Sequence, residues 1–299
     1  MAGTVGVIGV GMMGRGIAKN LLRKDFEVLV KGHRDRAPVD DLVAAGAAES
    51  ASPAAMAEAA EIVVMCVTAA PQVEAVVFGD DGLAQGARPG LTVIDCSTID
   101  AGTTAKIHAA FTERGADFAD APLARSPKEA EEGRLNTMVG AEPDTFARIR
   151  PVLEAFCENI FHVGPPGAGQ KTKLLNNFFT MGQAALIAEA LCAAAAAGVD
   201  IRKYFEVISA GGGNSGIFQM LVGRFLESGD YDGLRFGLKN AEKDLRYFVQ
   251  MTRDAGLTGA LGQRVHLSLL EGVKLGFGED FVGGLIGAQA KLNGVDIEV

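Results

Sequence analysis

The sequence predicts a two-domain protein, in which a doubly wound α/β domain over residues 1–164 precedes an all-helical domain over residues 165–299. Strand and helix patterns alternate repeatedly through the first 163 residues, which is typical of a parallel sheet covered by helices. The segment G-P-P-G at residues 164–167 then interrupts the chain. After this break strand patterns nearly vanish, so we expect the second domain to consist of helices.

The first domain is predicted from short apolar segments separated by helical ones. A strand at Thr4–Val10, a helix at Met13–Lys24 and a strand at Glu27–Lys31 come first. Ile62–Val67 is continuously apolar, as expected for a strand buried on both faces of a sheet. Repeated units of this kind imply right-handed crossovers. The later predicted elements are strands at Leu91–Asp95, Asp117–Asp120, Asn136–Gly140 and Asn159–Val163, and a helix at Ala101–Arg114.

The second domain is predicted from helical periodicity alone. Helices are expected over residues 168–197, 201–210, 215–228, 238–255, 261–274 and 280–292. The first would be about 45 Å long at ~1.5 Å per residue, long enough to leave the first domain and form the spine of the second. Its most apolar part, Phe178–Gly198, is rich in alanine and contains Gln183 and Glu189. We therefore expect a buried helix of a soluble protein rather than a membrane span.

Composition excludes several classes of function. The formal net charge of −9 argues against a surface that binds nucleic acid or anionic membranes. The four cysteines form no C-x-x-C pair and no zinc-type spacing with the four histidines, so we expect no metal site and reduced, mostly buried thiols. The N-terminus runs directly into a strand without a signal-peptide pattern. These features favour a cytoplasmic protein.

The first strand leads into G-V-G-M-M-G at residues 9–14, which matches the G-x-G-x-x-G pattern of dinucleotide-binding loops. Gly9 permits a tight turn, Gly11 lets the backbone approach a pyrophosphate, and Gly14 lets the helix pack on the strand. The free N–H groups at the helix start then face the phosphates. Glycine-rich turns after strands are common, but the position between strand and helix favours a dinucleotide.

The end of the second strand bears on the choice between NAD and NADP. NAD-binding proteins often place an acidic residue there, which binds the ribose 2′-hydroxyl, but this chain has Gly32. Basic residues surround the position and suit a 2′-phosphate; they are Lys31, His33, Arg34 and Arg36. Asp35 leaves open a solvated loop of mixed charge. The sequence therefore favours NADP, with NAD possible.

Lys173 and Asn177 lie four residues apart at the start of the long apolar helix, which places an ammonium and a carboxamide on one helical face. A charge that enters an apolar stretch is costly unless it is used. The alternative is an ordinary lysine whose head group reaches water. Combined with the glycine loop, the pair predicts a proton donor beside a nucleotide.

Five segments, in order along the chain, together resemble the motifs of the β-hydroxyacid dehydrogenase family, the group of 3-hydroxyisobutyrate dehydrogenase and the glyoxylate/succinic semialdehyde reductases. Residues 9–14 resemble its G-x-G-x-M-G loop, and residues 95–98 its D-x-S-T strand end. Residues 120–123 resemble its substrate loop, and residues 167–177 its G-x-G-x-x-x-K-x-x-N-N segment. Phe236 with Lys243-Asp244 resembles its distal F…K-D segment.

This resemblance implies a Rossmann-type domain and hydride transfer between NAD(P) and a small anionic hydroxy acid or its aldehyde. It makes Lys173 the catalytic residue, flanked by Asn176 and Asn177, which orient the substrate. Lys243 is expected to close over the nicotinamide end. The alternatives are that Lys243-Asp244 are only surface charges and that Thr98 is only a helix N-cap. The residues implied to bind the cofactor are Gly9, Gly11, Met12, Met13, Gly14, Arg34, Val67, Thr68, Thr98 and Lys243.

The chain departs from the family in its substrate loop. Where the family usually reads D-A-P-V-S-G-G, this chain has Ala124 and Arg125 in place of the serine and the first glycine. A similar arginine occurs in the sulfolactaldehyde reductase branch. A guanidinium can bind a carboxylate, sulfonate or phosphate through two parallel hydrogen bonds, whereas the alternative is a surface pair with Glu129. The predicted substrate-binding residues are Leu123, Arg125, Ser126, Asn176 and Asn177.

Two other functions remain open at this stage. Imine reductases share the two-domain plan but usually replace the lysine, so Lys173 argues against that activity. A non-catalytic NADP-binding scaffold need not keep Lys173 and Asn177. Alanine-rich helix faces in the second domain suggest self-association as a homodimer or homotetramer.

Overall fold

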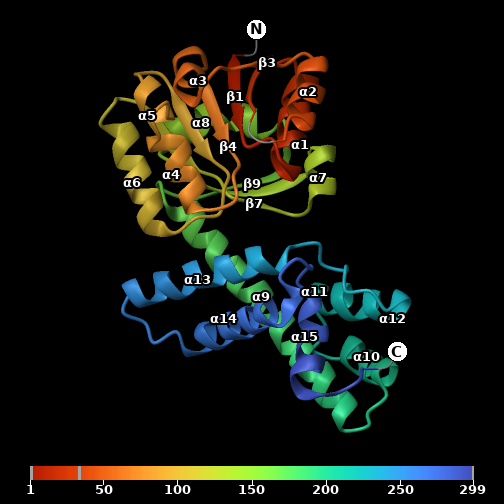
Figure 1. Cartoon of the computed structure of the whole chain (residues 1–299). Coiled ribbons are helices and arrows are strands. Elements are labelled where there is room, and N and C mark those ends of the chain that lie inside the picture. Colours follow the sequence, from red (N-terminus) through yellow and green to blue (C-terminus); the bar gives the residue numbers. More distant parts are fainter. Residues whose placement is uncertain (1–2, 33–34, 298–299) are drawn as a thin grey trace. The chain divides into compact units, whose positions relative to one another are not determined.

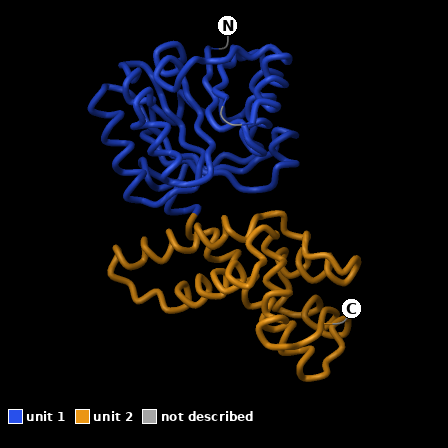
Figure 2. Tube along the Cα trace, viewed as in Figure 1, with its two compact units in different colours: residues 1–173 blue, residues 174–299 orange. Residues whose placement is uncertain are grey.

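The computed structural model describes residues 3–32 and 35–297 and divides into two compact units, Met1–Lys173 and Leu174–Val299 (Figure 2). Arg34, which was predicted to bind the cofactor, lies outside the described residues, as does His33. The first unit contains the sheet, and the second is helical apart from an isolated bridge between Gly237 and Phe281.

Within the described residues the first unit holds one sheet of nine strands, in the order β3-β2-β1-β4-β5-β6-β8-β7, with β9 paired to β8 (Figure 1). The parallel part comprises β1 (Thr4–Ile8), β2 (Glu27–Lys31), β3 (Ala48–Glu49), β4 (Ile62–Met65), β5 (Thr92–Asp95) and β6 (Asp117–Asp120). This order, 3-2-1-4-5-6, is that of dinucleotide-binding doubly wound sheets. Every residue of β4 is buried, which confirms the prediction from its unbroken apolar run.

Three further strands extend the sheet beyond β6. They are β7 (Leu123–Ala124), β8 (Leu135–Gly140) and β9 (Cys157–Gly164). β8 runs antiparallel to β6 and β7 but parallel to β9. The strands predicted at residues 136–140 and 159–163 are confirmed, whereas the two-residue strands β3 and β7 were not predicted, because they are too short to show alternation.

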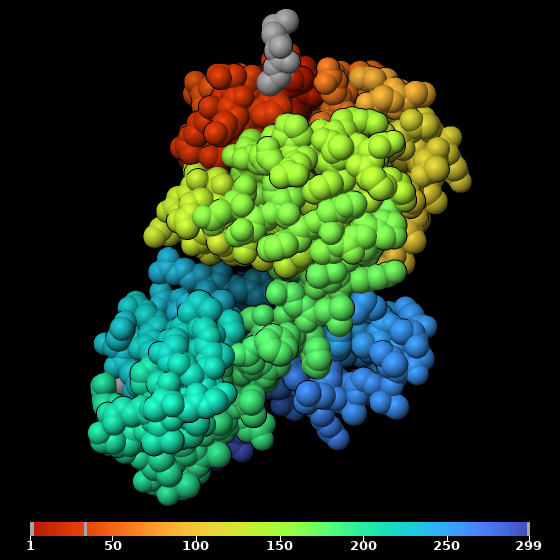
Figure 3. All heavy atoms as spheres, turned by 180° about the vertical axis from the view of Figure 1, so that it is seen from behind, coloured from red at the N-terminus to blue at the C-terminus, as the bar shows by residue number. Residues whose placement is uncertain are grey.

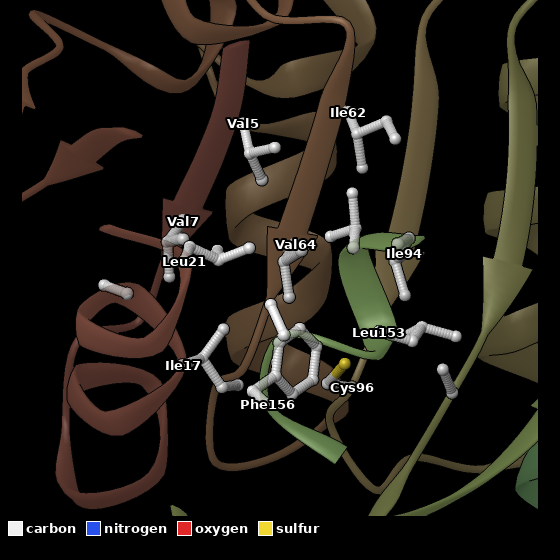
Figure 4. Close-up of a cluster of buried hydrophobic side chains, with 14 of the residues drawn as sticks. Val5, Val7, Ile17, Leu21, Ile62, Val64, Ile94, Cys96, Leu153 and Phe156 are labelled. Atoms are coloured by element: carbon white, nitrogen blue, oxygen red, sulfur yellow. The ribbon is translucent and has the colours of Figure 1, made fainter. Parts of the chain in front are cut away.

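Helices cover both faces of this sheet. Their bounds are α1 (Met12–Arg23), α2 (Ala37–Ala44), α3 (Pro53–Ala59), α4 (Ala70–Phe78), α5 (Leu83–Gly86), α6 (Ala101–Thr112), α7 (Pro127–Glu132) and α8 (Pro143–Leu153). Side chains of α1 and α8 meet the strands in one buried cluster, which includes Ile17, Leu21, Val64 and Leu153 (Figure 4). The segment from α7 to β9, yellow-green in Figure 3, forms the outer surface of this unit on the side seen there.

The second unit is built on the long helix α9 (Ala168–Ala196), whose first residues belong to the first unit. The other helices are α10 (Ile201–Ala210), α11 (Gly216–Phe218), α12 (Arg224–Ser228), α13 (Leu238–Asp254), α14 (Ala260–Gly272) and α15 (Gly284–Asn293). π-Helical turns at Gln219–Gly223 and Val273–Phe277 follow α11 and α14. The predicted helix over residues 215–228 is thus an α–π–α segment, and the last helix begins four residues later than predicted.

The apolar helix α9 is less buried than its composition suggests. It is long and apolar enough to cross a membrane by length and composition, and 33% of its most apolar window is buried inside the structure. Leu175, Phe179 and Leu186 are 53%, 72% and 69% exposed. The expectation of a buried helix is therefore correct for one face only.

Candidate active site

The glycine loop after β1 has the geometry that a dinucleotide requires. Gly9 has φ +91°, and a Cβ there would lie 2.2 Å from the carbonyl oxygen of Cys66. A Cβ on Gly14 would lie 2.0 Å from the carbonyl oxygen of Gly9, so only glycine lets α1 approach this closely. Around Gly11, by contrast, no atom lies within 4 Å of a Cβ position. The backbone at Gly11 is therefore open to a ligand.

The start of α1 adds free donors to this loop. The helix begins at Met12, and its N-cap, Gly11, provides no side-chain cap. The N–H groups of the first turn therefore remain available for an anion such as a pyrophosphate. The Met12 side chain is 76% exposed, while Met13 packs against the core. These residues fit the dinucleotide that the sequence predicted.

The loops that follow β4 and β5 are joined at the same edge of the sheet. The Val67 N–H donates to Ser97 Oγ at 3.0 Å, and the Ser97 N–H donates to Asp95 Oδ1 at 2.9 Å. Thr68 and Thr98 lie in these loops, at the carboxyl ends of parallel strands, where ligands of doubly wound sheets bind. The N-cap of α6 is Asp100, so the alternative that Thr98 is merely this cap is wrong.

Asp120, at the end of β6, fixes the start of α9. Its carboxylate accepts hydrogen bonds from the N–H groups of Gly167 and Gln170 at 2.5 and 2.6 Å. Burial raises the pKa of Asp120, and these backbone donors oppose that rise. A Cβ on Gly169 would lie 2.4 Å from the carbonyl oxygen of Met138, so glycine allows the helix to lie this close to the strands. The sequence motif contained Asp120, but we had not predicted it as a site residue.

Gln170 provides a second attachment and was also missed. Its Nε2 donates to the carbonyl oxygen of Ser97 at 2.7 Å, and its Oε1 accepts from the N–H of Ile99 at 3.2 Å. The side chain is completely buried. The sequence signal for Gln170 is its position three residues before Lys173, on the same face of the helix.

Lys173 follows Gln170 by three residues, so both side chains leave the same side of α9. Lys173 is 8% exposed, whereas its neighbour Lys171 is exposed. The alternative of an ordinary lysine with its head group in water is therefore wrong. The first turn of α9, held by Asp120 and Gln170, places this buried lysine by the carboxyl ends of β5 and β6.

Within the second unit, Asn177 belongs to a buried polar cluster. Its Nδ2 donates to Asp244 Oδ2 at 2.6 Å, and its Oδ1 accepts from Asn176 Nδ2 at 3.1 Å. Lys243 Nζ lies 3.2 Å from Asp244 Oδ1 and 5.6 Å from the centre of the Tyr247 ring. Lys243 and Asp244 are 8% and 2% exposed, so the alternative of surface charges is wrong.

Arg125 lies between β7 and α7 with φ +81°, a conformation that favours glycine. Its guanidinium pairs with Glu158 on β9 and donates to the carbonyl oxygen of Arg134 at 2.5 Å. Hydrogen bonding to Arg125 lowers the pKa of Glu158. The ion pair weighed as an alternative therefore exists, but its partner is Glu158 rather than Glu129.

The neighbours of Arg125 have structural partners. Leu123 is 8% exposed and packs in the core. The Ser126 hydroxyl caps α7 and bonds the Glu129 carboxylate, whose oxygen also accepts the Ser126 N–H at 3.0 Å. These contacts hold the residues on both sides of Arg125.

Comparison with known proteins gives the family. A model for the NAD binding domain of 6-phosphogluconate dehydrogenase matches residues 4–164. A second, described as NAD-binding of NADP-dependent 3-hydroxyisobutyrate dehydrogenase, matches residues 167–280. The chain belongs to the β-hydroxyacid dehydrogenase family. This confirms the family and the fold that the motifs implied.

Individual relatives agree with this assignment. The chain is 37% identical to the NAD-dependent L-serine dehydrogenase of Pseudomonas aeruginosa over 211 residues, 70% of each protein. It is 29% identical to the 2-(hydroxymethyl)glutarate dehydrogenase of Eubacterium barkeri over 98% of this chain and 97% of that one. The solved 3-hydroxyisobutyrate dehydrogenase of Mycobacterium tuberculosis, 27% identical, superposes with a TM-score of 0.86 over 96% of this chain and 99% of the other. As a member of this family, the protein is an NAD(P)-dependent oxidoreductase.

Proposed function

We propose that this β-hydroxyacid dehydrogenase transfers a hydride between NAD(P) and a small anionic hydroxy acid or its aldehyde, with Lys173 as the general acid and base. The burial of Lys173 on the anchored first turn of α9 carries this proposal. Burying an ammonium group costs free energy unless the group has a role. Lys173 lies by the carboxyl ends of the strands, where doubly wound sheets bind their ligands.

When bound, the nicotinamide gives or accepts the hydride at its C4 atom. In the reducing direction, negative charge develops on the substrate oxygen, and Lys173 Nζ donates a proton to it. In the oxidising direction, the Lys173 amine takes that proton from the hydroxyl group. Asn177, one turn further along α9, orients the substrate hydroxyl with its neighbour Asn176, and Asp244 holds the Asn177 carboxamide at 2.6 Å.

We assign binding of the substrate's anionic group to Arg125, because a planar guanidinium binds an anion through paired hydrogen bonds. Glu158 is the carboxylate that pairs with Arg125 in the structure. A substrate carboxylate, sulfonate or phosphate would compete with Glu158 for the same donors. Leu123 and Ser126 shape the loop that presents Arg125.

The remaining assignments follow the sequence. We assign residues 1–164 to the cofactor, with NADP preferred and NAD accepted, and residues 165–299 to substrate binding and self-association. Lys243 is assigned to the nicotinamide end. The exposed Leu175, Phe179 and Leu186 of α9 support a homodimer or homotetramer, because apolar surface of this kind often marks an interface. We also assign the protein to the cytoplasm, as its sequence favours.

Lys173→Ala tests the mechanism. Turnover should fall at least about 100-fold, the lower end for loss of a general acid, while the dissociation constant for NADPH stays nearly unchanged. Steady-state kinetics on a panel of small anionic aldehydes and hydroxy acids, with both cofactors, measures turnover. Fluorescence titration measures the dissociation constant for NADPH. Lys171→Ala, which removes an exposed lysine two residues away on the same helix, is the matched control and should keep full turnover.

Other outcomes would replace this proposal. Turnover by Lys173→Ala equal to that of Lys171→Ala would exclude Lys173 as the proton donor. Activity on cyclic imines without activity on hydroxy acids would make the protein an imine reductase. Tight NADPH binding with no turnover of any short 3- or 4-hydroxy acid or its aldehyde would indicate a cofactor-binding scaffold.

A further inference from the structure

Gly32 follows β2 directly, at the position where NAD-binding sheets of this type place a carboxylate for the ribose 2′-hydroxyl. A Cβ on Gly32 would lie 2.7 Å from Arg36 Nη1 and 2.9 Å from Glu49 Oε1. A side chain at residue 32 would therefore collide with these two head groups. The head groups of Arg36 and Glu49 thus occupy the space that the side chain of an acidic residue at position 32 would need.

Glu49 reaches this position from the neighbouring strand. β3 pairs in parallel with β2, with Glu49 opposite Val30, so the glutamate is brought beside the end of β2. Arg36 Nη1 donates to Glu49 Oε1 at 2.7 Å, and Arg36 Nη2 donates to Glu49 Oε2 at 3.0 Å. These two hydrogen bonds hold the Glu49 carboxylate beside the end of β2.

Asp40, on the first turn of α2, bonds the same guanidinium, because Arg36 Nη2 lies 2.9 Å from Asp40 Oδ1. Arg36 therefore shares its positive charge between two carboxylates, and the three groups together carry a charge of −1. The Arg36 and Glu49 side chains are 52% and 32% exposed, so both can be reached from solvent. The hydrogen bond from Arg36 lowers the pKa of Glu49, which keeps its carboxylate ionised at neutral pH.

NAD and NADP should interact differently with Arg36, Glu49 and Asp40. A ribose 2′-hydroxyl can donate to an ionised carboxylate, which favours NAD. A 2′-phosphate is attracted by the guanidinium but has to displace one carboxylate from it and is repelled by both. Among the basic residues that favour NADP, Lys31 and Arg36 are thus opposed by Glu49, which lies 13 positions after Arg36 in the sequence. Glu49 reaches this place because β3 pairs with β2.

We propose that Glu49 is a specificity-determining residue, which sets the ratio of NAD to NADP affinity by supplying a carboxylate at the ribose 2′ position and by holding Arg36. This inference rests on the dinucleotide site at residues 9–14 and is independent of the proposed substrate and of Lys173. It means that Glu49 restrains the preference for NADP that Lys31 and Arg36 would otherwise give.

The test is the ratio of the dissociation constants for NADPH and NADH, measured by fluorescence titration at an ionic strength of about 0.1 M. Glu49→Gln keeps the shape of the side chain and should lower the ratio Kd(NADPH)/Kd(NADH) by roughly tenfold, about 1.4 kcal/mol. Tighter NADPH binding and weaker NADH binding should both contribute. Arg36→Gln should shift the ratio in the opposite direction, because it removes the donor for the phosphate.

Two further variants separate this effect from general loss of charge. Asp40→Asn should lower the ratio less than Glu49→Gln, through NADPH alone, because Asp40 bonds Arg36, whereas the atoms nearest to a Cβ on Gly32 belong to Arg36, Glu49 and Val39. Glu74→Gln removes a glutamate from a comparable exposed pair, with Lys106 at 2.6 Å on helices α4 and α6, and should leave the ratio unchanged.

The proposal is overturned if Glu49→Gln, folded with the melting temperature of the wild type, changes the ratio less than about twofold, or if it weakens NADPH binding. It is also overturned if Glu74→Gln shifts the ratio as much as Glu49→Gln. A wild type that binds neither cofactor would reject the dinucleotide site itself. Loss of turnover in Lys173→Ala has no bearing on these titrations, so the two proposals fail separately.

Discussion

The first and second units each bury a carboxylate beside a predicted site residue, but they satisfy it in different ways. Asp120, in the first unit, accepts hydrogen bonds from backbone N–H groups at the start of α9. Asp244, in the second, accepts from the side chain of Asn177 and lies 3.2 Å from the Lys243 ammonium. Asp120 therefore fixes a piece of backbone, and Asp244 fixes the side chains of two predicted site residues.

This difference predicts how each cluster responds to change. Backbone donors stay in place when a side chain is altered, so they limit the damage to one lost acceptor. Side-chain donors depend on one another, and the removal of one member leaves a buried charge without its partner. The second cluster should therefore be the more fragile, and the raised pKa of Asp120 should make the first cluster respond to pH.

Asp244→Ala should have the largest effect on stability. It removes the carboxylate that lies against Lys243 and Asn177, and the loss of one partner from a buried ion pair costs about 3–5 kcal/mol. Urea unfolding measures the change. Asp254→Ala, on the exposed end of the same helix, α13, should cost far less, and an equal loss in both variants would mean that burial is not the cause.

Asp120 should give stability a pH dependence of unusual sign. Because burial raises the pKa of Asp120 in the folded protein, the folded state holds this proton more tightly than the unfolded chain, whose value is near 3.8. The contribution of Asp120 is therefore complete below this value and is lost as pH rises through the raised pKa.

Urea unfolding of the wild type and Asp120→Asn, at pH values from about 4 to 7, isolates this contribution. The wild-type stability minus that of Asp120→Asn should fall as pH rises. Glu129→Gln provides the opposite case, because the hydrogen bond from Ser126 lowers the pKa of Glu129, so there the difference should grow with pH. A difference that rises with pH for Asp120→Asn would show that its backbone donors outweigh its burial.

Arg125 should have the smallest effect on stability, because its ion pair with Glu158 is exposed rather than buried. Arg125→Gly and Arg125→Ala both remove the guanidinium, and both should raise KM for anionic substrates by the same factor. Glycine also relieves the positive φ, so Arg125→Gly should be more stable than Arg125→Ala by roughly 1 kcal/mol. Thermal unfolding and steady-state kinetics separate the two effects. An equal loss of activity on a neutral aldehyde would contradict an anion-binding role.

Local patterns were sufficient to predict most of the fold. The helix at residues 201–210 was predicted with its observed bounds, and the start of α9 at Ala168 was also correct. Such elements are specified by periodicity and capping residues within a few positions of one another. The two-residue strands β3 and β7 are too short to show periodicity in the sequence. They are strands only because they pair with β2 and β8.

The sequence by itself determined the α/β class, the change to helices after Gly164 and the glycine loop at residues 9–14, because each depends on neighbours along the chain. Only the tertiary structure decided how the charges are shared. Asn177 meets Asp244 across 67 positions, Arg125 meets Glu158 across 33, and Arg36 meets Glu49 across 13. The physical reason is that an ion pair or hydrogen bond depends on distance in space, and the pairing of strands and packing of helices set that distance.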